Sequence, residues 1–384
     1  MGRRFAASVV VALAASSTAH AQEAITDRDY AIDLYEGVAI GNTAWVGMGG
    51  AGAALIVGTA GALINASAPA VRPTTDTDGW SWDYHVDYLT GQYSSDYDNN
   101  GVAVVEGSGA QLLTAGLGLR VGDWATAVTV TGQTAPLASI DLAADALRLR
   151  FMVAKWFPSR DIAVGLGVQT ALFEIGTPAG EALFSIDGTG LISGITYVPR
   201  LRNFRIAGSL ESHILGADVS STCDPDDCMG YILPSRVVSA GRVVTGFAYR
   251  WADTAWNQLV GGDFRDERSV TVTTDLLVTA PADDAYGVEA FGMQQLQRSG
   301  ADFAVSVRAG VEVEPLPGRL RLRAGSYWEP GRFEDRGGRL HATFGAELRV
   351  FEFHAWGRRR GRLSFTGDVA SQYRNVAVSV GFWH

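Results

Sequence analysis

The stretch Trp80-Ser81-Trp82-Asp83-Tyr84-His85-Val86-Asp87-Tyr88 alternates between apolar or aromatic residues and polar ones. Successive side chains of a β-strand point to opposite faces, so this alternation predicts a strand with one aromatic face and one strongly polar face. The same pattern returns along the chain, for example in residues 147–153, 270–276 and 303–314. The sequence therefore predicts an all-β protein.

Long alternating strands that follow one another along most of a chain are typical of a transmembrane β-barrel. Their polar faces carry Arg, Glu and Asp, which are costly in a dry core and are accommodated in a wet lumen. Closure of the barrel leaves no unpaired backbone group in the hydrocarbon. We expect about 14 antiparallel strands, near residues 79–90, 109–120, 123–133, 144–157, 161–174, 189–199, 203–214, 236–250, 267–280, 302–314, 319–328, 339–352, 361–370 and 374–384.

The connections between these strands support the count. Every second connection is short, such as Val121-Gly122 and Pro158-Ser159-Arg160, as expected of periplasmic turns. The others are mostly longer and polar, and we expect them on the outer face. The connection 251–266 is long where a short turn is expected, so a bend or an extra short pair of strands there stays possible and would change the strand count.

Composition excludes several classes of protein. The chain has 384 residues, of which 47% are hydrophobic and 19% charged, so it can bury a sizeable core. Two cysteines rule out a disulfide-rich scaffold or a multi-cysteine metal site. A formal net charge of -10 makes nucleic acid an improbable partner, because nucleic-acid binding needs a basic surface.

The N-terminus has the three parts of a secretory signal peptide. Arg3 and Arg4 are basic, residues 5–15 are uncharged and mostly apolar, and Ala19-His20-Ala21 forms an A-x-A cleavage site. We therefore assign residues 1–21 to a signal peptide. Export to an oxidising compartment makes a disulfide between Cys223 and Cys228 plausible.

Residues 44–71 contain no charged side chain. Their length suits a membrane-spanning helix, but repeated glycine and alanine favour a packed plug of short helical pieces. We divide the exported chain into an N-terminal hatch or plug, residues 22–78, and a barrel, residues 79–384. We expect the hatch to sit in the lumen and to form the ligand path with these residues: Gly47, Gly49, Gly50, Leu55, Ile56, Val57, Leu63, Ile64 and Asn65, the last pinning the segment to the wall.

Charged residues on two adjacent strands form a second candidate site. Arg308, Glu312 and Glu314 share the inward face of one strand, and Arg319, Arg321 and Arg323 share that of the next. One interpretation is a cross-strand ladder of ion pairs in the lumen wall. The other is a ladder that steers a ligand carboxylate or shapes the exit path.

Two short motifs are weighed against simpler explanations. Gly47-x-Gly49-x-x-Gly52 matches a dinucleotide fingerprint but lacks the βαβ unit and the later acidic residue, so no cofactor is expected. Asp96-x-Asp98-x-Asn100-Gly101 matches the first half of a calcium loop, yet its twelfth position is Gly107 instead of Glu. A solvated outer loop is the simpler interpretation, and calcium binding stays open there.

The segment between the two cysteines is also acidic, with Asp224, Asp226 and Asp227. The simpler interpretation is a disulfide-closed loop tip, and the alternative is a divalent cation bridging to lipopolysaccharide. The histidines show no metal-ligand spacing, so no metal site is assigned. The chain has no G-x-S-x-G motif, and we expect no enzyme.

Several segments resemble the FadL-type outer-membrane transport proteins for long-chain fatty acids and aromatic hydrocarbons. Gly47-Met48-Gly49-Gly50-Ala51-Gly52-Ala53-Ala54 leads at similar spacing to Asn65-Ala66-Ser67, with Ala66 where that family has proline. Gly194-Ile195-Thr196-Tyr197-Val198-Pro199 and Phe204-Arg205-Ile206-Ala207-Gly208-Ser209 resemble the family's central hairpin. The segments opening at Leu233-Pro234 and at Arg321-Leu322-Arg323 are also similar.

The resemblance implies a 14-stranded barrel plugged by an N-terminal hatch, in the bacterial outer membrane. The expected function is passive uptake of hydrophobic small molecules, such as long-chain fatty acids or hydrocarbons. The alternative is a structural or surface-exposed barrel without transport. Expected partners are outer-membrane lipids, lipopolysaccharide and a hydrophobic ligand, with the protein acting as a monomer. The uncharged plug argues against a general porin, which needs an open polar lumen.

Overall fold

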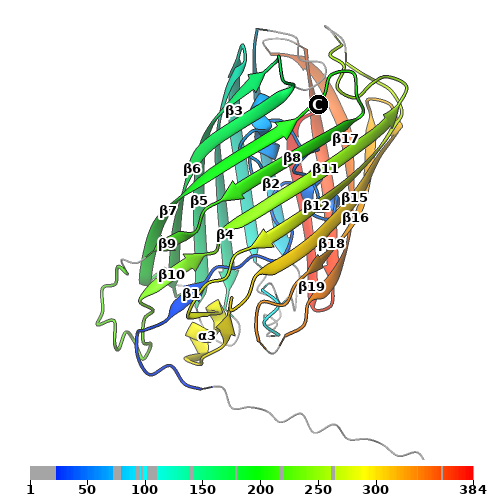
Figure 1. The fold of residues 1–384 in the computed structure, drawn as a ribbon. Helices are drawn as coiled ribbons and strands as arrows, with labels where there is room; N and C mark the ends of the chain where they lie inside the picture. Colours follow the sequence, from blue (N-terminus) through cyan, green and yellow to red (C-terminus); the bar gives the residue numbers. More distant parts are fainter. Residues whose placement is uncertain are drawn as a thin grey trace, which may run out of the picture.

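The computed structural model describes residues 23–71, 79–91, 96, 98–101, 110–137, 142–177, 180–216, 219–260, 264–334, 336–355 and 358–383. Within these residues, 14 strands close into an antiparallel barrel, and the last strand pairs with the first (Figure 1). They are β2 (Trp80–Gly91), β3 (Gln111–Val121), β4 (Trp124–Pro136), β5 (Ala143–Phe157), β6 (Ile162–Gly176), β7 (Ala182–Tyr197), β8 (Phe204–Glu211), β11 (Arg242–Ala252), β12 (Ser269–Thr279), β15 (Ala304–Leu316), β16 (Leu320–Glu329), β17 (Arg339–His354), β18 (Arg358–Ala370) and β19 (Tyr373–Phe382).

The predicted fold class, a barrel of about 14 antiparallel strands, is confirmed. The connection between β11 and β12 contains no further strand in its described part, so the strand pair left open there is absent from those residues. Two predicted boundaries are wrong. β7 begins at Ala182 instead of residue 189, and the single strand expected over 236–250 is divided at Ala240-Gly241 into two elements.

The two faces of the barrel differ as the alternation predicts. The outward face is apolar, with side chains such as Leu117, Leu149, Leu166 and Leu191 exposed. This is the surface that lipid covers in a transmembrane barrel. An aromatic group marks the end where the short turns lie, and its exposed members are Trp80, Trp124, Phe157, Tyr197 and Trp251. We call this the turn end and the opposite one the loop end.

A small five-stranded sheet lies at the loop end, below the barrel in Figure 1. Its order is β14 (Arg298–Ser299), β13 (Ala285–Tyr286), β1 (Ala31–Asp33), β10 (Arg236–Ser239) and β9 (Ile214–Gly216). The helix α3 (Val288–Met293) packs beside it, where Tyr30, Ile32, Phe184 and Phe291 share one apolar core. The start of the described chain is therefore held by the loops that follow β8 and β12.

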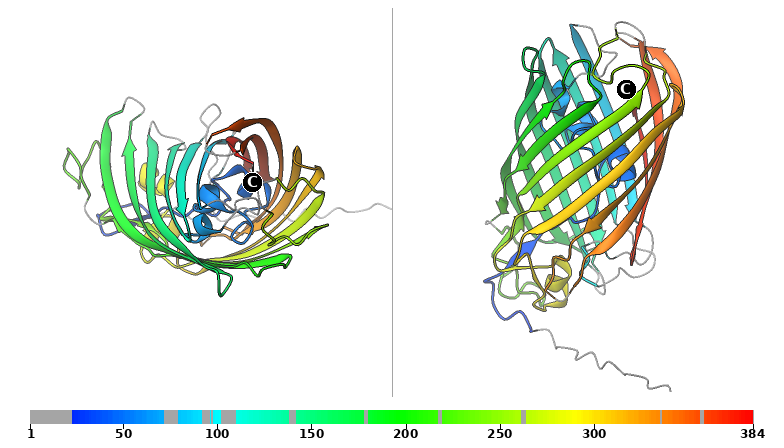
Figure 2. Two further views of the ribbon diagram at one scale, coloured as in Figure 1. Left: turned by 90° about the horizontal axis from the view of Figure 1, so that it is seen from above. Right: turned by 45° about the vertical axis from the view of Figure 1, so that its right-hand side comes forward.

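From β1 the chain enters the barrel, and Figure 2 shows it inside the ring of strands when viewed from above. We call residues 39–71 the lumen segment. It contains only short helices: α1 (Thr43–Gly47), α2 (Gly58–Gly61) and the 3-10 helix η1 (Ala68–Ala70). No helix among the described residues combines the length and the apolar character that a membrane crossing requires. The predicted signal peptide, residues 1–21, lies outside the described residues.

Candidate functional site

The lumen segment is held by carboxylates that project inward from the barrel wall. Each carboxylate accepts hydrogen bonds from backbone N–H groups of the segment. These N–H groups act as donors, because the segment has no charged side chain. Asp87 accepts from Thr43 N at 2.9 Å, Asp275 from Gly52 N at 2.8 Å, and Asp83 from Thr59 N at 2.8 Å. Hydrogen bonds to an ionised acceptor are stronger than neutral ones. The wall therefore fixes the segment at three separate points.

Glycines on both surfaces let the segment's backbone approach the wall. Gly49 has a φ of 64°, and an added Cβ there would lie 2.6 Å from the carbonyl oxygen of Ala309. In the wall, an added Cβ at Gly310 or Gly325 would overlap the backbone of Met48 and Gly49. A positive φ and a close approach are the two conditions that only glycine meets without strain.

The structure brings the other expected glycines to the same wall. An added Cβ at Gly47 would lie 3.1 Å from Thr366 Oγ1. At Gly50, with a φ of 69°, it would lie 2.5 Å from the guanidinium of Arg308. Arg308 itself, expected as part of the charge ladder, lies 5.6 Å from the ring of Trp45 and donates to the carbonyl of Gly37. Among the described residues, Arg308 contacts the lumen segment and forms no ion pair with another member of the ladder.

Asn65 lies against the opposite wall. Its side-chain amide donates to Thr196 Oγ1 at 3.1 Å, and its Oδ1 accepts from Ser67 Oγ at 2.8 Å. An added Cβ at Gly194 of β7 would overlap the Asn65 side chain, so the wall leaves space for it. These contacts attach the second half of the segment to β7.

The apolar residues assigned to a ligand path divide into two groups. Leu55, Ile56 and Val57 are half-buried and line a cavity on the turn side of the segment. Leu63 and Ile64 are buried in an apolar cluster with Ala207 of β8 and Ala248 of β11. The second pair therefore packs the segment against the wall and does not border that cavity.

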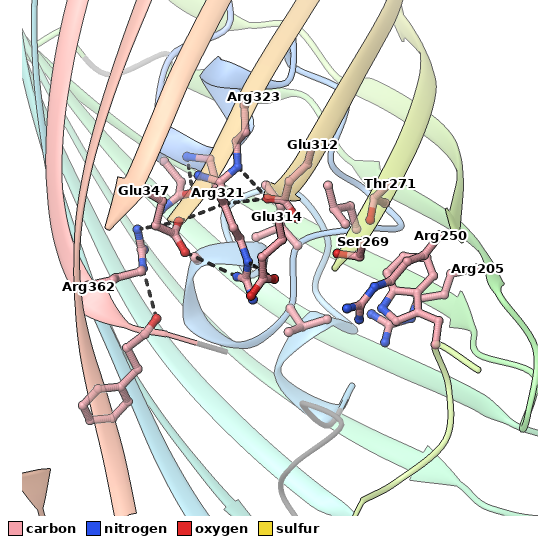
Figure 3. A pocket seen from close by; sticks show the side chains of 18 residues that line it. Arg205, Arg250, Ser269, Thr271, Glu312, Glu314, Arg321, Arg323, Glu347 and Arg362 are labelled. Atoms are coloured by element: carbon pink, nitrogen blue, oxygen red, sulfur yellow. Dashed lines mark hydrogen bonds and ion pairs between the residues drawn. The ribbon is translucent and has the colours of Figure 1, made fainter. Parts of the chain in front are cut away.

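The same cavity, of about 140 Å³, is bounded on its other side by charged residues of β15 to β18 (Figure 3). Glu347 lies at the centre of their network, 2.8 Å from Arg323, 3.4 Å from Arg321 and 3.5 Å from Arg362. Two further pairs join neighbouring strands, Arg323–Glu312 at 2.7 Å and Arg321–Glu314 at 3.1 Å. Four of the expected ladder residues thus form one network. Arg319 lies in the turn before β16 with its side chain exposed, outside this network.

Replacing Glu347 with Gln should destabilise the barrel by about 3 kcal/mol, because three partly buried guanidinium groups lose a shared counter-ion. Urea unfolding in detergent, followed by tryptophan fluorescence, measures the change. Glu352→Gln is the matched control, since Glu352 and its partner Arg358 are exposed at the rim, where ion pairs contribute little. The second partner of Glu352, Arg360, keeps Asp266 as a counter-ion. Equal stability of both variants would show that the network is solvated and does not stabilise the wall.

A second cavity, of about 100 Å³, lies on the loop side of the lumen segment. Most of its lining is apolar and comes from the N-terminal residues, the wall and α3: Leu34, Val38, Ile40, Ala135, Leu137, Ala144, Ala146, Phe173 and Val288. Its charged lining residues are Asp33, Glu36, Asp98, Arg148 and Glu289. Arg148 and Glu36 pair with each other at 2.6 Å. This cavity suits an apolar group better than an ion.

Asp98 and Glu289 border this cavity on the loop side and hydrogen-bond to each other. Burial and the neighbouring charges of Glu289 and Asp96 raise the pKa of Asp98 well above its usual value, and burial raises that of Glu289. Asn100 donates to Glu289 Oε2 at 2.8 Å. The connection between β2 and β3 is thereby joined to α3 through carboxyl groups that favour the protonated form.

The first carboxylate of the calcium-like motif, that of Asp96, binds backbone N–H groups of the motif itself. The two oxygens of Asp96 accept from the backbone N–H groups of Asn100 at 3.0 Å and Gly101 at 2.8 Å. Residues 102–109, which include the remaining positions of the motif, lie outside the described residues. In the described part of the chain, no group of three or more acidic, His or Cys side chains is arranged to hold a metal ion.

We expect the contact between Asp98 and Glu289 to weaken as the pH rises. A raised pKa in the docked state means that the contact is fully favourable below the undocked pKa of about 4 and is lost as the pH rises through the raised value. Protection factors of the Asn100 and Gly101 amides, measured by hydrogen exchange from pH 4 to 8, should therefore fall. The fall should be smaller in Asp98→Asn, whose amide still bonds Glu289, and unchanged in the exposed control Asp226→Asn. A flat wild-type profile would contradict this coupling.

Cys223 and Cys228 are joined by a disulfide, with their Cα atoms 5.2 Å apart. It closes a short loop between β9 and β10 whose acidic residues Asp224, Asp226 and Asp227 point away from the core. Cys228 is buried in the same apolar core as Phe291. The disulfide therefore anchors this loop beside α3 at the loop end.

No protein-family model matches the sequence, and no curated protein matches it. Solved structures do resemble it. A FadL homologue from Pseudomonas aeruginosa has 13% identity and a TM-score of 0.52 over 89% of this chain and 96% of its own. The CymD monoaromatic hydrocarbon channel has 12% identity and a TM-score of 0.52 over 90% and 97% of the two chains. The P. putida toluene transporter TodX has 12% identity and a TM-score of 0.51 over 89% and 98%.

The TM-scores show a shared fold. The sequence identities are too low to show a shared ligand, so the ligand has to be argued from this chain's own residues. The likeness spans nearly the whole length of each neighbour, so it covers the complete barrel and not one hairpin. The chain therefore has the fold of the FadL homologue and of these hydrocarbon channels, and the resemblance expected from its sequence is confirmed at the level of the fold.

Proposed function

We propose that this protein is an outer-membrane channel for the passive uptake of hydrophobic small molecules, such as hydrocarbons or long-chain fatty acids. The observation that carries the proposal is the apolar cavity of about 100 Å³ on the loop side of the lumen segment. A general porin has an open aqueous lumen and no such apolar chamber. The neighbours named as toluene and monoaromatic hydrocarbon channels support the same class of ligand.

In the proposed mechanism, a ligand partitions from outside into this apolar cavity. The lumen segment separates the cavity from the one lined by Leu55, Ile56 and Val57 on its turn side. Movement of the segment, as a hatch, then connects the two cavities. Its many small residues and its attachment through a few wall carboxylates support such a movement, because few large side chains have to be withdrawn from the wall.

The proposal places the protein as a monomer in the bacterial outer membrane, in contact with its lipids and with lipopolysaccharide. The apolar outward face and the aromatic group at the turn end support this location. No step requires an enzyme or a cofactor, since partition and diffusion suffice for uptake down a gradient.

Uptake of toluene and of decanoate by liposomes that contain the refolded protein tests the proposal. Both should enter faster than into protein-free liposomes, while arabinose should not. Ala144→Trp should lower apolar uptake about tenfold or more, because its ring fills the apolar cavity. Leu147→Trp, which changes an exposed outward side chain of the same strand, should leave uptake unchanged.

Apolar uptake no faster than that of protein-free liposomes, with a correctly folded wild-type protein, would reject the proposal. A barrel with a structural or surface role, and no transport, would then be the better explanation. Entry of arabinose together with toluene would instead indicate a general porin.

A further inference from the structure

Arg205 of β8 is a buried cation without a carboxylate partner. Its side chain projects inward and the residue is only 3% exposed. Its Nε donates to the side-chain oxygen of Asn257 at 2.8 Å, and its guanidinium stacks on the ring of Trp256 at 4.0 Å. In the described part of the chain it forms no ion pair. Other lumen arginines, such as Arg150 and Arg323, each bind a glutamate.

The charges nearest to Arg205 are also positive. Arg250 and Arg265 lie close enough to repel it. Both of these arginines share one carboxylate, Glu267, at 3.5 Å and 3.6 Å. Glu314 also attracts Arg250, but among the described residues no carboxylate forms an ion pair with Arg205. Burying an uncompensated charge is costly, so this arrangement favours an anion at Arg205.

Open space borders the free side of this guanidinium. Arg205 lines the cavity of about 140 Å³ beneath the lumen segment and also a larger one of about 600 Å³ at the turn end. In Figure 3 the nitrogens of Arg205 and Arg250 point into the first cavity, across from the Glu347 network. The hydrogen bond to Asn257 and the stacking on Trp256 hold the guanidinium plane in place, which prepares it for a two-point contact with an oxyanion.

Each of the two cavities has an apolar part of its wall beside charged residues, which include Glu312 and Glu314 in the smaller cavity and Asp123 and Arg200 in the larger one. Leu55, Ile56 and Val57 bound the smaller cavity. The larger cavity includes Val71, Trp156, Val198, Leu201 and Leu259. A ligand that fits both features has one anionic head group and an apolar chain. A neutral hydrocarbon would use the walls but would leave the cation unpaired.

We propose that Arg205, oriented by Asn257 and Trp256 and assisted by Arg250, binds the anionic head group of an amphiphile at the turn end of the lumen. The site lies on the far side of the lumen segment from the apolar cavity, so it acts after the segment has been passed. This inference rests on the proposed uptake of hydrophobic molecules and adds a head-group requirement at the exit. Carboxylate and phosphate head groups share the chemistry that the site recognises.

Binding to the full-length protein in nanodiscs of uncharged lipid tests the site, with decanoate, decyl phosphate and decanol as probes. Arg205→Gln should weaken binding of at least one anion about tenfold or more, since a charge-assisted bidentate contact is lost. Decanol affinity should change less than about twofold, because its contacts are apolar. Arg205→Lys keeps the charge without the planar fork and should show an intermediate loss. Arg202→Gln, an exposed arginine in the preceding turn, is the matched control.

Loss of affinity for one anion more than the other identifies the head group. Unchanged affinity for both anions in Arg205→Gln, or an equal loss for decanol, would overturn the proposal. If Arg205→Gln does not fold, anion affinity in Arg205→Lys equal to wild type would overturn it as well. The proposed uptake function fails separately, when liposomes with the wild-type protein take up toluene no faster than protein-free liposomes although the protein still binds decanoate.

Discussion

Replacing residues 47–67 with a flexible Gly/Ser linker of equal length should raise the ion conductance of the protein in planar bilayers about tenfold or more, since an unplugged barrel of this strand number encloses a water-filled lumen. In the wild type, the lumen segment fills the section between Asp87, Asp275 and the β7 wall. We expect the wild type to be nearly closed. Single-channel recording of both proteins at the same salt concentration gives the ratio.

The linker variant needs evidence that its barrel is intact. A β-rich circular dichroism spectrum and a shift between boiled and unboiled samples on gels provide it, because neither depends on the lumen segment. Unchanged conductance in a variant that passes both tests would mean that residues 47–67 do not block the lumen. High ion conductance of the wild type, equal to that of the variant, would likewise show that these residues do not block the lumen.

Gly325→Leu should displace the first half of the lumen segment without deleting it. An added Cβ at Gly325 would overlap the backbone of Gly49, and a leucine side chain needs still more space. Displacement of the backbone there also breaks the hydrogen bond from Gly49 N to Thr343 Oγ1, which is 2.9 Å long. We expect the conductance to rise severalfold and proteolysis within residues 47–57 to begin, because overpacking of this kind costs about 1–3 kcal/mol.

Gly132→Leu is the matched control for this substitution. Gly132 lies in a barrel strand, and an added Cβ there would meet no atom within 4 Å. Its conductance and its protease resistance should equal those of the wild type. If Gly325→Leu also behaves like wild type, the contact between β16 and the lumen segment is looser than the structure indicates.

The barrel strands were predictable because one physical rule governs each of them. A strand between lipid and a wet lumen must alternate, and Leu147, Leu149 and Phe151 follow that rule without exception. The rule fails where a strand leaves the membrane. Leu183 and Phe184 are consecutive, so they point to opposite faces of β7, yet both are buried in the apolar core at the loop end. The alternation is lost there, and the sequence therefore did not predict the start of β7.

The division between β10 and β11 was missed for a related reason. Val237 and Val238 resemble Val243 and Val244 in composition, and nothing local tells which pair enters the barrel. β10 instead pairs with β1, some 200 residues earlier in the chain. Alternation reports the environment of a strand and not the identity of its partner.

The candidate site was less accessible from the sequence than the fold. The absence of charge in residues 44–71 predicted a segment that packs inside the barrel. It did not predict which side chains of the wall would bind the segment. Asp83, Asp87 and Asp275 look like any lumen-facing residues until the backbone that they bind is known. The residues next to Arg205 in the sequence do not mark it as a binding residue either. Its lack of a carboxylate partner becomes visible only when the neighbouring strands are placed in space.

The path of the lumen segment affects how the protein assembles. The segment immediately precedes β2, yet α1 packs against β16, β17 and β18 near the other end of the chain. The seam of the barrel is the pair β19–β2, which closes around the segment. The segment touches both strands of this seam, through α2 on β2 and through α1 on β19. Its seating therefore joins the two ends of the barrel sequence, and contacts between residues so far apart along the chain form slowly.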